Sequence, residues 1–164
     1  RIGANIGVRT LESLTGAAPI ATYLHGRRIG TVVVIEGGDA GLGHDIAMHV
    51  AAISPRYLAP EDVPADQVEK EREIFVAQAA SDPKLQGKPK EVLAKACEGK
   101  LRKYLGEITL LGQPFVKDDK QSVAQVLKQA NARVLRFVRY EVGAGIEKKQ
   151  ENFAAEVMAQ VRGA

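Results

Sequence analysis

The stretch TVVVIEGGDAGLGHDIAMHVAA, residues 31–52, holds the end of a strand, a glycine-rich turn and a helix in one run. Its β-branched residues belong to a predicted strand over 29–35. PIATYLH, residues 19–25, has the composition of a second strand, and HGRR, residues 25–28, is typical of a turn. The pattern therefore predicts a β-hairpin followed by a helix.

The glycine-rich turn raises the question of a phosphate site. Gly38 and Gly43 have the Gly-x-x-x-x-Gly spacing of a P-loop, but the lysine and the hydroxyl that should follow are missing. His44 and Asp45 occupy those positions, and a carboxylate would repel phosphates. We expect the glycines to form a tight turn and Asp45 to cap or charge the N-terminus of a helix over 45–54. A small nucleotide-binding enzyme is therefore only a third hypothesis, which a failure to bind any Mg²⁺-nucleotide would exclude.

Two helices on either side of a short break predict an antiparallel helical hairpin. The first helix covers about 66–80 and the second about 90–105, where apolar residues recur with i, i+3 and i+4 spacing. The break SDPKLQGKP, residues 81–89, holds two prolines and a glycine. The other predicted elements are a strand over 5–14, a loop over 110–119, a helix over 122–130 with Ser122 as its N-cap, a strand over 133–142 and a final helix over 151–161.

Composition narrows the class of protein. The net charge of +3 and the isoelectric point of about 9.0 are too mildly basic to indicate nucleic-acid binding by themselves. No apolar run approaches the roughly 18–20 residues that a membrane span needs, and no signal peptide is visible. The single cysteine, Cys97, permits no internal disulfide and fits a reducing compartment, so we expect a cytoplasmic protein.

No group of residues is spaced for catalysis, metal binding or cofactor binding. His44 and His49 are five residues apart, which places them on different faces of a helix, and His25 stands apart from both. We expect His49 to pack against the core, Cys97 to be a small buried hydrophobic residue and Tyr104 to end the apolar seam of its helix. The sequence thus predicts no catalytic residues, no metal and no cofactor, and we do not expect an enzyme.

A basic run within the second helix of the hairpin leaves an alternative open. Residues 84–103 carry seven lysines and arginines against two glutamates. A solvated helix face explains such a run. The alternative is an RNA- or ribosome-associated binding module that uses the basic helical hairpin, and a strong salt dependence of RNA binding would favour it.

The chain resembles translation elongation factor Ts over nearly its whole length. The resemblance rests on a series of segments in order, of which IAMHVAA, GQPFV and FAAEV are individually specific. The segments are YLHGRRIGTVVV (23–34), DIAMHVAAISPRYL (45–58), EDVPADQVEKEREI (61–74), GKPKEVLAKACEGKLRKYLGEITLLGQPFVKDD (87–119) and FVRYEVGAGIEKKQENFAAEV (137–157).

This resemblance implies an α+β fold, in which a small antiparallel β-sheet is packed with helices and an antiparallel helical hairpin, the coiled coil of the family, is inserted. It also implies a division of the chain into four parts. They are 1–65, the end of the N-terminal subdomain with the sheet and helix of the C-terminal subdomain; 66–106, the hairpin insertion; 107–142, the return to the C-terminal subdomain; and 143–164, a C-terminal helical module.

The family promotes the release of GDP from elongation factor Tu by protein–protein contact, and it binds no nucleotide itself. The resemblance therefore implies elongation factor Tu as the partner, and a homodimer would rest on the resemblance alone. His25 matches the family histidine that inserts against domain 3 of elongation factor Tu. The residues expected to contact the partner beside it are Tyr23, Gly26, Arg27, Arg28 and Ile29, and those expected on the closing helix, which docks on the G domain, are Phe153, Val157 and Met158.

The chain departs from the family pattern in several places. The family's N-terminal helical domain and its Thr-Asp-Phe-Val-Ala-Lys-Asp motif, which enters the G domain near the nucleotide, have no counterpart here. Ala4 and Ala144 replace two glutamates that are usual in the family, and the break at 81–89 is longer than usual. We therefore expect a C-terminal piece of a longer factor that binds elongation factor Tu with impaired exchange.

Overall fold

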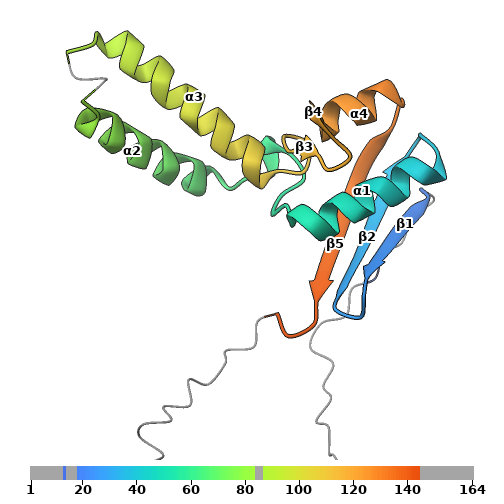
Figure 1. Ribbon diagram of the computed structural model, residues 1–164. Coiled ribbons are helices and arrows are strands. Elements are labelled where there is room, and N and C mark those ends of the chain that lie inside the picture. Colours follow the sequence, from blue (N-terminus) through green and yellow to red (C-terminus); the bar gives the residue numbers. More distant parts are fainter. Residues whose placement is uncertain (1–12, 14–17, 84–86, 145–164) are drawn as a thin grey trace, which may run out of the picture.

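The computed structural model describes residue 13 and residues 18–83 and 87–144, which form an α+β fold (Figure 1). A three-stranded antiparallel sheet has the order β1-β2-β5, α1 lies across one face of it, and α2 and α3 project from it as a pair. The elements are β1 (Ile20–His25), β2 (Ile29–Glu36), α1 (Ala40–Ile53), a 3₁₀ turn η1 (Pro60–Asp62), α2 (Ala65–Ser81), α3 (Lys90–Ile108), β3 (Pro114–Phe115), β4 (Asp118–Ser122), α4 (Val123–Gln129) and β5 (Arg133–Glu141).

The predicted β-hairpin is confirmed, and β2 is the central strand of the sheet. Its register pairs His25 with Ile29 on one side, and Val33 with Phe137 on the other. Alternate residues of β2 point towards α1, and Val33 is fully buried there. The main core lies between this face of the sheet and α1, and it is closed at one end by α4 and the β3–β4 ribbon.

Helix α1 begins five residues earlier than the sequence predicted. Asp39, not Asp45, is the N-cap, and its carboxylate accepts a hydrogen bond from the backbone N–H of Leu42 at 2.7 Å. Gly37 and Gly38 form a tight turn with φ of +77° and +70°, whereas Gly43, which was also expected in the turn, lies inside α1. Asp45 lies inside the helix, and its carboxylate pairs with Lys117 at 2.8 Å. Glycine has a low helix propensity, so the sequence analysis set the start of the helix after the last glycine of the segment. This was wrong, because α1 includes two of those glycines.

The segment over 110–119 is not the predicted loop throughout. It contains β3 and the start of β4, which pair as a two-stranded ribbon with Phe115 opposite Asp118. The side chain of Phe115 is buried in the core. Ser122 caps α4 as predicted, since its hydroxyl accepts from the N–H of Gln125 while the Gln125 side chain accepts from the N–H of Ser122.

His49 is packed in the core, as predicted, and it ties α1 to the β3–β4 ribbon. The backbone N–H of Val116 donates to Nδ1 at 3.2 Å, so Nε2 carries the proton and donates to Oε1 of Gln113 at 2.9 Å. The ring also stacks on Phe115 with centroids 6.1 Å apart. Burial lowers the pKa of His49, and the hydrogen bond to Gln113 opposes that shift.

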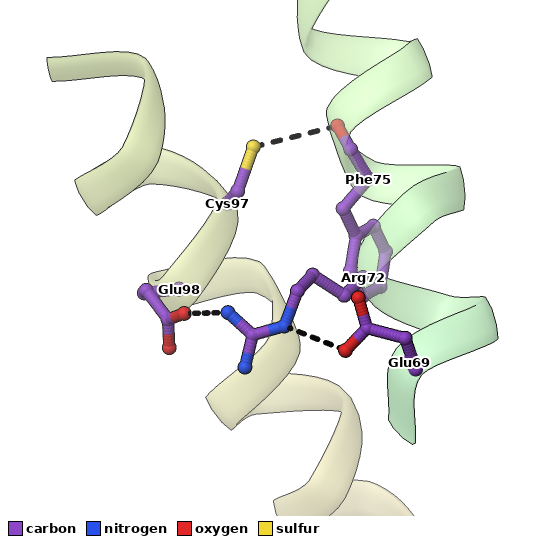
Figure 2. Close-up of polar contacts among 5 residues, drawn as sticks. All are labelled: Glu69, Arg72, Phe75, Cys97 and Glu98. Carbon is purple, nitrogen blue, oxygen red and sulfur yellow. Dashed lines mark hydrogen bonds and ion pairs between the residues drawn. The ribbon is translucent and has the colours of Figure 1, made fainter. Parts of the chain in front are cut away.

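The two helices predicted around the break at 81–89 are confirmed, and they pack side by side (Figures 1 and 2). Buried Cys97 donates from Sγ to the carbonyl of Phe75 at 3.6 Å, which fits its predicted structural role. Arg72 of α2 bridges Glu69 on its own helix and Glu98 on α3. Tyr104 packs edge-on against Phe75, as expected for the end of the seam.

Some predictions fall outside the described residues. The strand expected over 5–14 lies almost entirely outside them, and the closing helix over 151–161 lies wholly outside them. Among the helices that the structure does describe, none is both long enough and apolar enough to cross a membrane.

Candidate protein-binding site at the β1–β2 turn

The turn between β1 and β2 lies at one end of the sheet (Figure 1). Its residues 25–28 are exposed to solvent. Gly26 has a φ of +58°, a left-handed conformation that favours glycine. The N–H of Arg28 donates to the carbonyl of His25 at 3.4 Å and closes the turn. The side chains of His25, Arg27 and Arg28 are exposed, while Ile29 is half-buried where β2 begins.

Tyr23 links this turn to α1. Its hydroxyl lies 3.2 Å from Nδ1 of His25, and the two rings stack with centroids 6.2 Å apart. On its other side, His44 of α1 meets Tyr23 edge-on, with centroids 5.4 Å apart and an interplanar angle of 73°. The structure therefore aligns His44, Tyr23 and His25 in one row of rings.

The hairpin brings together the six expected contact residues of the turn, Tyr23, His25, Gly26, Arg27, Arg28 and Ile29. The other three, Phe153, Val157 and Met158, lie outside the described residues. Sequence reasoning missed His44 as a neighbour of Tyr23. No local signal could have found it, because the contact depends on how α1 crosses the sheet.

The chemistry of the turn suits binding more than bond making. It offers imidazole and guanidinium donors, and neither Arg27 nor Arg28 forms an ion pair with any residue that the structure describes. Across residues 18–83 and 87–144, no three His, Cys, Asp or Glu side chains gather in a way that could hold a metal ion. Two neighbouring cationic side chains that pair with no described residue favour an acidic or acceptor-rich surface on another molecule.

The glycine-rich segment lines a groove of about 420 Å³ between β1 and the start of α1. Its position at a helix N-terminus is one where phosphates often bind. Here the carboxylate of Asp39 already accepts from the N–H of Leu42 at that terminus. A phosphate would have to displace this negatively charged cap, so the geometry disfavours a nucleotide in the groove.

Comparisons with known proteins give one consistent result. The family model described as Elongation factor TS matches residues 1–144. The chain is 55% identical to the Elongation factor Ts of Halorhodospira halophila over 162 residues, which cover 99% of this chain and 54% of that protein. It is 52% identical to the Elongation factor Ts of Idiomarina loihiensis over 164 residues, or 100% of this chain and 55% of that protein.

A third relative, the Elongation factor Ts of Methylococcus capsulatus, is 55% identical over 163 residues, which cover 99% of this chain and 54% of the relative. The chain thus spans about half the length of the curated relatives it matches. The high identity over this half, together with the family model that covers most of the chain, shows that this chain belongs to the elongation factor Ts family.

Proposed function

We propose that this chain binds elongation factor Tu through the β1–β2 turn and that, within an intact elongation factor Ts, it promotes the release of GDP from that partner. Membership of the elongation factor Ts family supports the partner. The observation that carries the proposed site is the exposed turn, which presents His25 and two arginines that form no ion pair with any described residue. The expected cytoplasmic location and the four-part division of the chain belong to the same proposal.

Each turn residue has a proposed part in the contact. His25 inserts against the partner, Tyr23 supports it, and Arg27 and Arg28 supply charged donors at the rim of the interface. Gly26 allows the tight reversal that its φ of +58° requires, and Ile29 anchors the turn on the sheet. A second contact uses Phe153, Val157 and Met158, which lie outside the described residues.

The proposed mechanism is not enzymatic. A protein that prefers nucleotide-free elongation factor Tu over the GDP-bound form must weaken GDP binding by the same factor by which GDP weakens its own binding. Such a protein needs complementary surfaces and no general acid, base or nucleophile. The donors at the turn, which have no carboxylate partner among the described residues, fit that requirement.

The test is a binding titration of elongation factor Tu with the chain and with His25→Ala. We expect His25→Ala to weaken binding by about 1–3 kcal/mol, the range of an interface anchor. Lys128→Ala, an exposed change on α4 at the opposite end of the sheet, is the control and should bind as the unchanged chain does. Equal affinities for all three chains would show that the turn is not part of the interface. If the unchanged chain did not bind elongation factor Tu at micromolar concentrations, the proposal would be overturned.

The RNA-binding alternative finds less support in the structure. The basic helix α3 lies beside α2, which carries four acidic side chains against two basic ones. Arg72 of α2 pairs across the helices with Glu98. This mixture of charges weakens the positive field that non-specific RNA binding requires.

A further inference from the structure

The position of His25 on β1 leaves its ring with one polar contact. His25 and Tyr23 are two residues apart, so their side chains lie on the same face of the strand. Within the described part of the chain, the only hydrogen bond to the imidazole of His25 joins Nδ1 to the Tyr23 hydroxyl at 3.2 Å. Nε2 has no partner there. One ring nitrogen is therefore held by the protein and the other is open to another molecule.

The ring of Tyr23 is itself held in place. It packs against the hydrophobic core and is only partly buried, and His44 meets it edge-on at 5.4 Å. Edge-to-face ring pairs of this kind contribute about 0.5–1.5 kcal/mol beyond the area they bury. The phenol oxygen is thus fixed by contacts to the sheet and to α1, and it can in turn restrain an exposed neighbour.

The Tyr23 hydroxyl can donate to Nδ1 of a neutral His25, or accept from Nδ1–H in the other tautomer, and donation is the arrangement that the proposal below uses. A neutral imidazole has one N–H and one lone pair, whereas a phenol is a good O–H donor. With the phenol donating to the lone pair of Nδ1, the proton of the imidazole resides on Nε2. The exposed nitrogen is then a hydrogen-bond donor, and the molecule that it meets must supply an oxygen acceptor.

We propose that Tyr23 is a positioning residue that holds His25 with its Nε2–H directed to a carbonyl or carboxylate oxygen of the partner, and that His44 steadies Tyr23. The part that concerns the partner rests on the proposed function, whereas the part that concerns the free chain does not. Ordering a side chain at an interface costs about 0.5–1.5 kcal/mol, so a ring that is already held loses less on binding. Arg27 and Arg28 on the same turn favour an acceptor-rich surface.

The first arm of the test is nitrogen NMR of the imidazole in the free chain at about pH 8.5, where histidine is ordinarily neutral. We expect Nε2 of His25 to carry the proton and the resonance of Nδ1 to be displaced by the hydrogen bond that it accepts. Tyr23→Phe keeps the ring and removes the hydroxyl, so the displacement should vanish. Tyr140→Phe, which removes a hydroxyl on β5, should leave it unchanged. A proton on Nδ1, or a spectrum unaffected by Tyr23→Phe, would overturn the proposal.

The second arm is the affinity for elongation factor Tu. We expect Tyr23→Phe to weaken binding about 2- to 10-fold, the net contribution of one hydrogen bond, and His44→Ala to act in the same direction. Because Tyr23 acts through His25, adding Tyr23→Phe to His25→Ala should weaken binding no further. Additive losses would overturn the positioning role. If the NMR spectra showed the expected proton on Nε2 and the expected displacement of Nδ1, but His25→Ala did not change binding, the proposed function would be contradicted. The inferred hydrogen bond in the free chain would still hold.

Discussion

Gly43 shows how one residue can set the distance between a helix and a strand. A Cβ added at Gly43 would lie 2.9 Å from the Cβ of Ala21 on β1, which is closer than such atoms approach. We expect Gly43→Ala to lower the free energy of unfolding by about 1–3 kcal/mol through overpacking, despite the better helix propensity of alanine. Urea denaturation measures the change.

The matched control for this substitution is Gly99→Ala on the exposed side of α3. A Cβ at Gly99 meets nothing within 4 Å, so only the helix propensity changes. We expect this variant to be about 0.5–1 kcal/mol more stable than the unchanged chain. If Gly43→Ala were stabilised to the same extent, the contact between α1 and β1 would not be as tight as the structure has it.

At the scale of elements, His49 couples α1 to the β3–β4 ribbon, and the coupling depends on pH. Burial lowers its pKa in the folded chain, so the unfolded chain binds more protons as the pH falls through the ordinary value of about 6.5. The free energy of unfolding should therefore decrease from about pH 7 downward, until the lowered pKa of the folded state is reached. Urea denaturation at a series of pH values measures this decrease.

His49→Gln removes the titrating group, and it isolates the contribution of the histidine. We expect it to cost about 1–3 kcal/mol at neutral pH, because the amide cannot satisfy both Gln113 and the N–H of Val116 as the ring does. The gap between the two chains should narrow as the pH falls, since only the histidine loses stability by protonation. A gap that stayed constant with pH would show that His49 does not resist protonation in the fold.

The elements that the sequence predicted best are those with local signals. Ser122 and Gln125 form a capping box three residues apart, and the apolar stripe of α3 marks its helix without reference to any other segment. The β3–β4 ribbon was missed because its short strands are stabilised by non-local contacts, above all those of Phe115 with the core and with His49. The start of α1 was misplaced because glycines there serve a close approach that only the folded chain reveals.

The candidate site likewise has one part that local sequence predicts and another part that depends on contacts between distant segments. The β1–β2 turn and the position of His25 follow from a hairpin pattern in one continuous stretch of sequence, residues 19–35. The contact between Tyr23 and His44 joins residues of two different elements and depends on the crossing of α1 over the sheet. The exposed turn was therefore predictable from local sequence, its contact with a partner rests on the resemblance, and the arrangement that orients its side chains was not predictable.

At the scale of the whole molecule, binding and nucleotide release are proposed to depend on different parts of the factor. The proposed contact surface, the β1–β2 turn, lies at one end of the sheet, and the helical hairpin projects elsewhere (Figure 1). These 164 residues hold no counterpart of the family's Thr-Asp-Phe-Val-Ala-Lys-Asp motif, which resemblance ties to the nucleotide site. A chain with the first surface and without that motif should bind elongation factor Tu while perturbing GDP little.

Thermodynamic linkage makes this separation measurable. The ratio of the affinities of the chain for nucleotide-free and GDP-bound elongation factor Tu must equal the factor by which the chain weakens GDP. We expect a ratio within about 5-fold of unity, below the coupling of about 1–3 kcal/mol that allosteric partners typically show. An intact elongation factor Ts measured under the same conditions should give a larger ratio and a faster release of a fluorescent GDP analogue. If this chain matched the intact factor in both, the turn and its surroundings would suffice for exchange, and the proposed division between binding and release would be wrong.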